Sequence, residues 1–278
     1  MSGRLTVIGL GPGNADQVTP EASRAVAEAK FFYGYKPYLD RLDLRPDQTR
    51  VASDNREELA RSKDALVKAA EGHDVAVVSG GDPGVFAMAA AVCEAIEAGP
   101  AEWHAVDVAV VPGVTAMLAV AARIGAPLGH DFCAISLSDN LKPWELIELR
   151  LLAAAGAGFV IALYNPISKA RPWQLGRAFE CLTAILPGTT PVIFGRAAGR
   201  PDERIEVFLL ADVDAERPTW RLASSSARRK QGSSSAATSR RWSIRRAPRQ
   251  GRANDRPARR VHRWFRRSAR PAGWVCAP

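Results

Sequence analysis

The apolar run from Val75 to Val78 is followed at once by Ser-Gly-Gly-Asp-Pro-Gly, and this stretch restricts the fold more than any other. An unbroken apolar run that is β-branched at three of four positions is typical of a strand buried in a parallel sheet. The Ala-rich stretch from Val85 to Glu97 then predicts a helix. A strand that ends in glycines just before a helix lies where open α/β sheets bind ligands.

Taken alone, the glycine-rich stretch has two interpretations. In the first, Gly80 and Gly81 let the main chain approach a flat or extended ligand, and Asp82 places one carboxylate at the rim. In the second, the stretch is only a turn between strand and helix, with Asp82 as the helix cap. The rest of the chain must decide between them.

Strand and helix patterns alternate along the first 125 residues. The apolar stretch 5–10 predicts a first strand, and Thr19, Pro20 and Glu21 are typical of the start of a helix that reaches about Lys30. A short apolar piece then leads into an aromatic loop at residues 34–38. Further patterns predict a helix over 56–71 and a strand over 106–111. This order predicts a parallel sheet with helices on its faces.

After Gly129 the pattern changes modestly, and shorter connections allow mixed strand directions. We expect strands at 133–137, 159–164, 191–194 and 204–210, and helices at 141–155 and 172–186. The predicted fold class is therefore α/β, with two α/β domains at residues 1–125 and 126–217.

The charge of the chain is divided unevenly. Of its 38 Lys and Arg and 29 Asp and Glu, 17 bases and one acid (Asp255) fall in residues 218–278, which leaves 21 bases and 28 acids in residues 1–217. The last segment is also rich in serine and has no helical or alternating period. It is interpreted first as a shifted reading frame of a GC-rich gene, then as a disordered basic tail, and then as a nucleic-acid-binding arm.

The length of the apolar stretches and the spacing of the cysteines and histidines disfavour several classes of function. No stretch approaches the roughly 18 apolar residues of a membrane helix, and no signal peptide is expected. The cysteines are far apart, and no histidines have metal-binding spacing, so we expect neither a disulfide nor a metal. These features together favour a cytoplasmic protein.

The first glycine-rich loop, Gly9-Leu10-Gly11-Pro12-Gly13, does not fit a nucleotide-phosphate site. The third glycine of a dinucleotide fingerprint falls at Asn14, Pro12 has no amide to donate, and no P-loop motif is present. Small-residue loops without phosphate chemistry suit a cofactor that has an adenosine part and no phosphate.

Three segments together resemble the signature segments of the tetrapyrrole methyltransferases: 9–13, 79–86 and 111–116. Segments 53–57, 129–139 and 163–166 further resemble the precorrin-3B C(17)-methyltransferase branch of that family, and the resemblance covers about residues 4–210. It implies two α/β domains with a cleft for S-adenosylmethionine between them. It also implies methylation of precorrin-3B at C-17 with ring contraction to precorrin-4 in cobalamin biosynthesis, and a homodimer.

The resemblance also implies roles for single residues. The expected cofactor contacts are Pro12, Gly80, Gly81, Asp82, Val85, Thr115, Ala116, Tyr164 and Ala197. Tyr164 has a structural alternative as an aromatic side chain that fills the core. Family members continue after the last expected strand with closing strands that are not readable here, so the second domain is expected to be incomplete.

The substrate carries many carboxylates, and this predicts a local group of bases in the cleft. The candidates are Lys142, Lys169 and Arg171, whose alternative is solvated surface charge. Methyl transfer from a sulfonium needs little acid–base help, and no acid or base for ring contraction is identified. The alternative functions are methylation of another macrocycle carbon, of uroporphyrinogen III or of a protein or RNA, and non-specific nucleic-acid binding through the basic segment.

Overall fold

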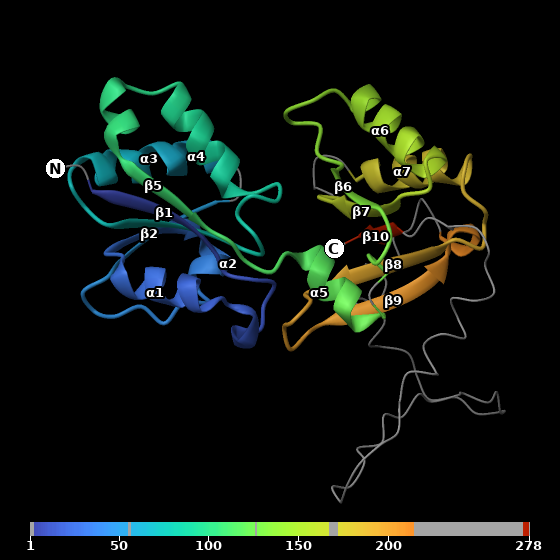
Figure 1. Ribbon diagram of the computed structural model, residues 1–278, viewed down its shortest axis with the longest axis horizontal. Coiled ribbons are helices and arrows are strands. Elements are labelled where there is room, and N and C mark those ends of the chain that lie inside the picture. Colours follow the sequence, from blue (N-terminus) through green and yellow to red (C-terminus); the bar gives the residue numbers. More distant parts are fainter. Residues whose placement is uncertain (1–2, 55–56, 126, 167–171, 214–274, 278) are drawn as a thin grey trace, which may run out of the picture.

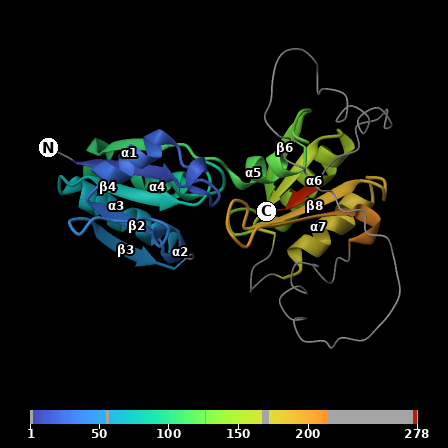
Figure 2. The same ribbon diagram turned by 90° about the horizontal axis from the view of Figure 1, so that it is seen from below.

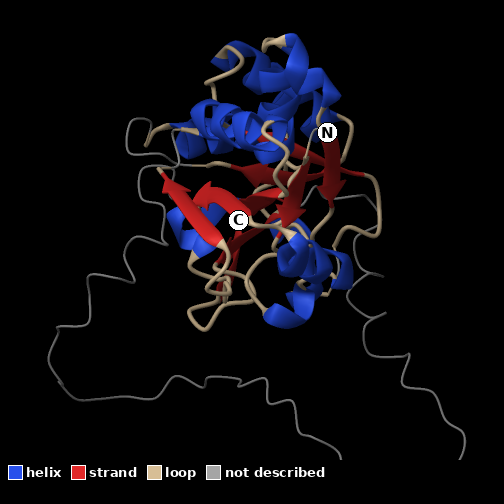
Figure 3. Ribbon diagram, turned by 90° about the vertical axis from the view of Figure 1, so that its left-hand side faces the viewer, coloured by secondary structure: helices blue, strands red, loops and turns tan. Residues whose placement is uncertain are grey.

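The computed structural model describes residues 3–54, 57–125, 127–166, 172–213 and 275–277, and these form two α/β lobes joined side by side (Figure 1). Seen from below, the lobes remain separate units that meet near helix α5 (Figure 2). Viewed from the side of the first lobe, with the lobes one behind the other, strands lie in the middle of the molecule and helices lie above and below them (Figure 3). None of the described helices is long and apolar enough to span a membrane.

The first lobe has a five-stranded sheet whose strand order is β3-β2-β4-β1-β5, with every pair parallel. Its strands are β1 (Arg4–Gly9), β2 (Phe31–Tyr35), β3 (Thr49–Ser53), β4 (Val75–Ser79) and β5 (Asp107–Val111). Its helical segments are η1 (Ala15–Gln17), α1 (Pro20–Glu28), α2 (Lys36–Leu39), α3 (Glu58–Ala70), α4 (Met88–Glu97) and η2 (Ala101–Ala105). The parallel sheet expected from the strand–helix alternation is confirmed.

Both faces of the first sheet are buried, because alternate strand residues point to opposite sides. On β4, Val75 and Val77 pack with α3 and α4, whereas Ala76 and Val78 pack on the opposite face with α1 and Leu39. All five residues of β4 are buried, which explains its unbroken apolar sequence.

The second lobe has a mixed sheet of order β6-β7-β10-β8-β9, in which only β9 is antiparallel to its neighbour. Its strands are β6 (Phe132–Ser136), β7 (Val160–Tyr164), β8 (Pro191–Arg196), β9 (Arg204–Leu209) and β10 (Val275–Ala277). Its helical segments are α5 (Ala116–Arg123), α6 (Trp144–Gly156), α7 (Gln174–Thr183) and η3 (Leu210–Asp212). The core on one face of the sheet is formed by α6 and α7.

Helix α5 covers the other face of the second sheet. Met117, Ala119 and Val120 of this helix are buried against Ala162 on β7 and Ile193 on β8. The chain therefore crosses between lobes directly after β5, about ten residues before the boundary expected at 125 (Figure 1). A Cβ at Gly195 would be 3.1 Å from Val120 Cγ1, so this glycine allows the helix to approach the sheet closely.

Three elements of the first lobe differ from the sequence expectations. The aromatic loop expected at 34–38 is instead the end of β2 followed by the short helix α2. Strand β3 was not expected. Helix α4 begins at Met88 and not at Val85, because Phe86 has a left-handed φ of 51° that a helix does not permit.

The segment 218–278 contributes one strand to the fold. β10 pairs in parallel with both β7 and β8, whereas the basic segment was expected to stay outside the second domain. Residues 214–274 lie outside the described part of the chain.

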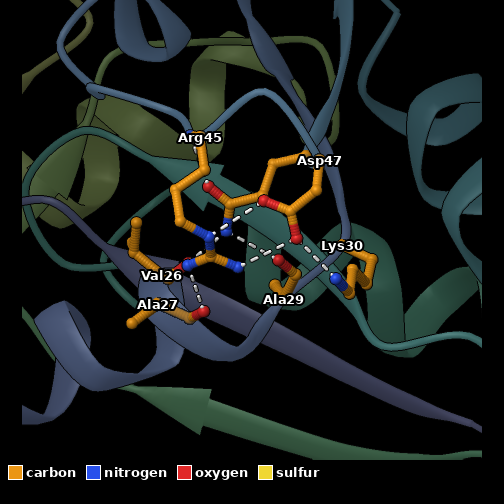
Figure 4. Close-up of polar contacts among 7 residues, drawn as sticks. Val26, Ala27, Ala29, Lys30, Arg45 and Asp47 are labelled. Atoms are coloured by element: carbon orange, nitrogen blue, oxygen red, sulfur yellow. Dashed lines mark hydrogen bonds and ion pairs between the residues drawn. The ribbon is translucent and has the colours of Figure 1, made fainter.

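The carboxyl end of α1 is held by side chains from the loop that precedes β3 (Figure 4). Arg45 Nη1 donates to the Ala27 carbonyl at 2.7 Å, and Gln48 Nε2 donates to the Val26 and Ala29 carbonyls at 2.9 and 2.8 Å. Asp47 in turn accepts hydrogen bonds from Arg45 and Lys30. Carbonyls that a helix end leaves without partners are thus satisfied from a loop about twenty residues away.

We expect Gln48→Ala to lower the free energy of unfolding by about 1–2 kcal/mol, because two part-buried carbonyls lose their donor. Urea denaturation followed by circular dichroism measures this. The exposed Arg24→Ala on α1 serves as the control and should change the free energy of unfolding by less than about 0.5 kcal/mol. Equal losses in the two variants would contradict the role given to Gln48.

Hydrogen bonds from Arg45 and then Lys30 hold the pKa of Asp47 well below its usual range. A depressed folded-state pKa stabilises the protein above the unfolded-state pKa, and that stabilisation is lost as the pH falls through the folded-state pKa. Asp47→Asn should therefore lower the melting temperature slightly at pH 7. The difference from the parent should shrink as the pH is lowered below about 4, the ordinary carboxyl range. Thermal unfolding at a series of pH values measures this, and a difference that does not depend on pH would contradict it.

Candidate functional site

Three glycine-rich loops leave neighbouring strands at one edge of the first sheet. β4, β1 and β5 are adjacent and parallel, so the loops after Ser79, Gly9 and Val111 emerge side by side. From β1 the chain crosses to β2 beyond β4, and from β4 it crosses to β5 on the other side of β1. Such a reversal of direction opens the crevice in which α/β sheets bind ligands.

Main chain packs directly against main chain where these loops meet. A Cβ at Gly9 would be 2.8 Å from both the Gly113 nitrogen and the Gly81 carbonyl oxygen. A Cβ at Gly113 would overlap that same carbonyl oxygen and lie 3.0 Å from Gly9 O. Glycine is required at these positions because no side-chain atom fits between the loops.

Hydrogen bonds join the three loops into one unit. Gly11 and Gly81 form a two-way bridge, with N···O distances of 3.1 and 2.9 Å. Asp82 accepts from the Gly84 N–H through Oδ1 at 2.8 Å and from the Gly113 N–H through Oδ2 at 3.0 Å. Asp82 therefore connects the central loop to the third loop. It is not the cap of α4, whose N-cap residue is Ala87.

The second lobe reaches the same place through Tyr164 at the end of β7. Its hydroxyl is 2.6 Å from Thr115 Oγ1 and accepts from the Met117 N–H at 3.1 Å, and its ring contacts Phe86 with the centroids 5.2 Å apart. Tyr164 and Thr115 are both buried. The side chain thus links the third loop to the second sheet, which a residue that only fills the core does not do.

Backbone strain is concentrated around this junction. Among the described non-glycine residues, only Phe86, Asn165 and Ala197 have positive φ, at 51°, 51° and 52°. Phe86 ends the central loop, Asn165 follows Tyr164, and Ala197 follows β8. Left-handed backbone in residues such as phenylalanine and alanine costs about 1 kcal/mol or more and is typical of ligand-binding loops.

The hairpin after β8 closes the remaining side of the first loop. A Cβ at Gly13 would be 3.1 Å from the Ala198 carbonyl oxygen, so the two lobes touch there. Glu203 accepts from the Gly199 N–H at 2.5 Å and from Arg123 at 3.2 Å. The Gly199 hydrogen bond, followed by the contribution of Arg123, lowers the pKa of Glu203 and keeps it ionised.

Most of the cofactor contacts expected from the sequence therefore surround one junction. Gly80, Gly81, Asp82 and Val85 lie on the central loop, and Val85 packs against the α5 cluster of the second lobe. Pro12 lies on the first loop, Thr115 and Ala116 begin α5, and Tyr164 and Ala197 come from the second lobe. Their contacts with a cofactor stay a prediction.

Of the three expected substrate-binding bases, Lys142 alone is described. It is half-buried after β6, and its Nζ donates to the Ser138 carbonyl at 2.9 Å. Burial, and then the charge of Arg150, lowers its pKa. Lys169 and Arg171 lie outside the described residues.

Sequence reasoning assigned no role to Tyr38 and Arg41, which also reach this edge. Arg41 donates to the Leu10 and Gly11 carbonyls at 2.5 and 3.1 Å, and the ring of Tyr38 lies against Gly80. The only available signal was the run of aromatic residues at 34–38, which indicates a loop or a core equally well.

We expect Tyr164→Phe to lower the free energy of unfolding by about 1–3 kcal/mol, because the buried Thr115 hydroxyl and Met117 N–H lose their partner. Chemical denaturation measures the change. Tyr33→Phe is the matched control, because Tyr33 is also buried but makes no side-chain hydrogen bond within the described chain. Equal stabilities of the Tyr164 variant and the parent would contradict a polar link between the lobes.

The model of one protein family, the Tetrapyrrole (Corrin/Porphyrin) Methylases, matches residues 4–214. The chain belongs to this family. The resemblance inferred from the three glycine-rich segments is confirmed, and with it the fold class. The matched region ends at residue 214, four residues before the basic segment 218–278.

Individual relatives agree with this. A Sinorhizobium precorrin-3B C(17)-methyltransferase is 73% identical over 217 residues, which cover 78% of this chain and 85% of that protein. Cobalamin biosynthesis protein CobIJ of Mycobacterium tuberculosis is 49% identical, over 77% of this chain and 42% of its own length.

Solved structures show the same architecture. A crystal structure of the methyltransferase CobJ matches with a TM-score of 0.75 and 52% identity, over 77% of this chain and 90% of that one. A uroporphyrin-III C-methyltransferase from Thermus thermophilus, complexed with S-adenosylhomocysteine, matches with a TM-score of 0.56 over 78% of this chain and 89% of that one. At 24% identity the second match shows the fold alone.

Proposed function

We propose that this protein transfers a methyl group from S-adenosylmethionine to C-17 of precorrin-3B, with ring contraction to precorrin-4, in cobalamin biosynthesis. The observation that carries the proposal is the junction of three glycine-rich loops, joined by Asp82 and linked to the second lobe by Tyr164. The 73% identity to a precorrin-3B C(17)-methyltransferase supports the choice of substrate.

The residues at this junction fit such a cofactor. The loops present glycine main chain, which allows close approach of an extended ligand, and the Asp82 carboxylate suits a neighbouring positive sulfonium. The proposed contacts are the residues expected from the sequence: Pro12, Gly80, Gly81, Asp82, Val85, Thr115, Ala116, Tyr164 and Ala197. When bound, S-adenosylmethionine supplies a methyl group that is already activated by its positive sulfur.

The contribution of the protein is then mainly to hold the two reactants in line. Both Asp82 oxygens accept main-chain hydrogen bonds, so Asp82 positions the loops and is not assigned a proton transfer. Tyr164 fixes the start of α5 against the second sheet. Lys142, Lys169 and Arg171 are retained as candidate partners of the substrate carboxylates.

Incubation with precorrin-3B and methyl-labelled S-adenosylmethionine tests the proposed function. The expected product carries the label at C-17 and has the absorption spectrum of a contracted ring. Label at another carbon, or label only in a parallel incubation with uroporphyrinogen III, would identify a sister activity and overturn the assignment. Heat-inactivated protein serves as the control for transfer without enzyme.

We also propose a cytoplasmic homodimer, as the family resemblance implies. Apolar side chains exposed on the second lobe support an interface there, since Leu141 is 87% and Leu149 63% exposed. Light scattering coupled to size-exclusion chromatography measures the oligomeric state, and a monomer at micromolar concentration would overturn this part.

A further inference from the structure

Tyr38 presents a phenol at the central loop that no function described above uses. A Cβ at Gly80 would be 2.6 Å from Tyr38 Cε1 and 3.1 Å from its hydroxyl oxygen, so the end of the ring lies directly on the loop. The side chain is half-buried, and its hydroxyl has no hydrogen-bond partner within the described chain. Its ring contacts Tyr35 edge-on, with the centroids 5.5 Å apart.

Arg41 follows Tyr38 at the end of α2, and its main-chain N–H donates to the Tyr38 carbonyl at 3.1 Å. Arg41 is half-buried, and the only hydrogen-bond acceptors of its guanidinium in the described chain are the Leu10 and Gly11 carbonyls. Arg61 is 4% exposed and donates to Ser53 Oγ at 2.7 Å and to the Asp54 carbonyl at 2.6 Å. Neither forms an ion pair with a carboxylate among the described residues.

Burial disfavours the charged form of both guanidinium groups. Burial, and then the nearby charge of Arg200, lowers the pKa of Arg41. Burial also lowers the pKa of Arg61, while the charges of Glu58, Glu57 and Asp54 act in the opposite direction. A guanidinium stays protonated in a protein, so it requires an anion or good acceptors when it is taken out of water. Arginines and a phenol that lacks a partner are all donors, and the ligand that complements them is a carboxylate.

We propose that Tyr38 and Arg41 bind a carboxylate of the tetrapyrrole substrate at the edge of the central loop. This inference rests on the proposed function, because it takes its ligand from that substrate class. It adds a subsite in the first lobe to the candidate bases of the second lobe. Arg41 also holds the first loop, so the subsite and the cofactor loops share one side chain.

Tyr38→Phe tests the subsite, because it keeps the ring on Gly80 and removes only the hydroxyl. Tyr35→Phe is the matched control on the neighbouring ring. The probe is uroporphyrin, a stable porphyrin octacarboxylate, and its binding is followed by fluorescence quenching. We expect the Kd for uroporphyrin and the KM for precorrin-3B to rise about tenfold in Tyr38→Phe only. The Kd for S-adenosylhomocysteine should stay unchanged in both variants.

Equal uroporphyrin affinities for the two phenylalanine variants would overturn the subsite. Arg41→Gln provides a second measurement, with weaker uroporphyrin binding and a smaller dependence of that binding on salt expected. Weaker binding of S-adenosylhomocysteine with unchanged binding of uroporphyrin would show that Arg41 only supports the loop. If the parent binds uroporphyrin through Tyr38 but methylates no precorrin, the proposed function fails and the subsite stands.

A separate observation concerns the gap between β7 and β8. Both strands are buried over nearly all of their length, but β10 is three residues long and β8 is six. The register pairs Val275 with Ile161 and Val192, and it ends where Ala277 meets Phe194. A buried main chain requires hydrogen-bond partners, so this gap can hold a longer strand than β10.

The chain leaves β9 at the end of the sheet where such a strand must begin. β9 is antiparallel to β8 and pairs Leu209 with Pro191, and the Leu210 N–H donates to the Thr190 carbonyl at 2.8 Å. A strand parallel to β8 in the gap starts at this same end. A connection of a few residues from Val213 is therefore long enough.

If Ser224, Ser225 and Ser226 are encoded by TCN codons, the codons of residues 223–227 specify an apolar strand in another frame. In this frame each new codon joins the third base of one codon to the first two bases of the next. From Ala223 to Ser226, with serine as TCN, this gives three NTC codons. These specify Phe, Leu, Ile or Val, whatever the third base is. The step from Ser226 to Ala227 becomes NGC, which specifies Cys, Arg, Ser or Gly. The resulting pattern is that of Val192-Ile193-Phe194-Gly195 in β8.

We infer that the gap between β7 and β8 is built for the peptide encoded in this third-base frame, about ten residues after Val213. The basic, serine-rich sequence from about Thr219 is then its out-of-frame translation and not a nucleic-acid arm. The family match agrees, since it ends at residue 214.

A chain that carries the third-base frame from codon 219 tests this against the full chain as it stands. We expect a higher melting temperature and at least about tenfold slower hydrogen exchange at the amides of Ile161 and Ile193. Replacing the three apolar residues of the new strand by serine should reverse both effects. Unchanged exchange would overturn the inference. So would an intact mass, measured on the protein from its own cells, that equals the mass of the present sequence.

Discussion

Gly113→Val is expected to weaken the binding of S-adenosylhomocysteine at least about a hundredfold. A Cβ at this position would overlap the Gly81 carbonyl oxygen and lie 3.0 Å from the carbonyl carbon and oxygen of Gly9. All three atoms belong to main chain, and the Gly11–Gly81 bridge holds their loops together. Because no side chain can rotate away, the added atoms must separate the three loops that form the proposed cofactor wall.

Isothermal titration calorimetry with S-adenosylhomocysteine measures this loss. Gly156→Ala is the matched control, because a Cβ there meets nothing within 4 Å. It should leave the Kd unchanged and raise the free energy of unfolding by about 0.5–1 kcal/mol. A Gly113 variant that binds with the parent's Kd would show that the three loops do not form the cofactor site.

The elements that sequence reasoning predicted well are those whose own residues specify them. β4 is buried along its whole length, so its apolar run is visible without any knowledge of its neighbours. Thr19 caps α1 through a local hydrogen bond to the Ala22 N–H, as its position before Pro20 predicts. β3 was missed because it is an edge strand with mostly exposed residues, and its pairing with β2 defines it.

The geometry of the site could not be predicted in the same way, because its contacts join residues far apart in the chain. Asp82 meets Gly113 and Tyr164 meets Thr115 across 31 and 49 positions. Glycine-rich loops indicate where main chain can approach a ligand, but not which side chain joins them. Tyr38 is the clearest example, since its place on Gly80 depends on the order of β2 and β4 in the sheet.

Asp82→Asn is expected to weaken the binding of S-adenosylhomocysteine by about ten- to a hundredfold. The carboxylate accepts from Gly84 N–H with one oxygen and from Gly113 N–H with the other. An asparagine has only one acceptor oxygen, so either the Gly84 or the Gly113 N–H loses its acceptor and meets an amide donor in its place. The change is nearly isosteric, so the loss reports on the hydrogen bonds and the charge.

The same variant separates positioning from proton transfer. If Asp82 only positions the loops, the dependence of kcat on pH should keep its shape in Asp82→Asn, because no titrating group of the reaction has been removed. A general base at this position would instead remove one limb of that profile. Asp82→Glu keeps the charge but displaces the oxygens. The dependence of its kcat on pH should match that of the parent, whether Asp82 positions the loops or acts as a base. Asp82→Glu should not recover the Kd, because both N–H groups are held at fixed places by the loops.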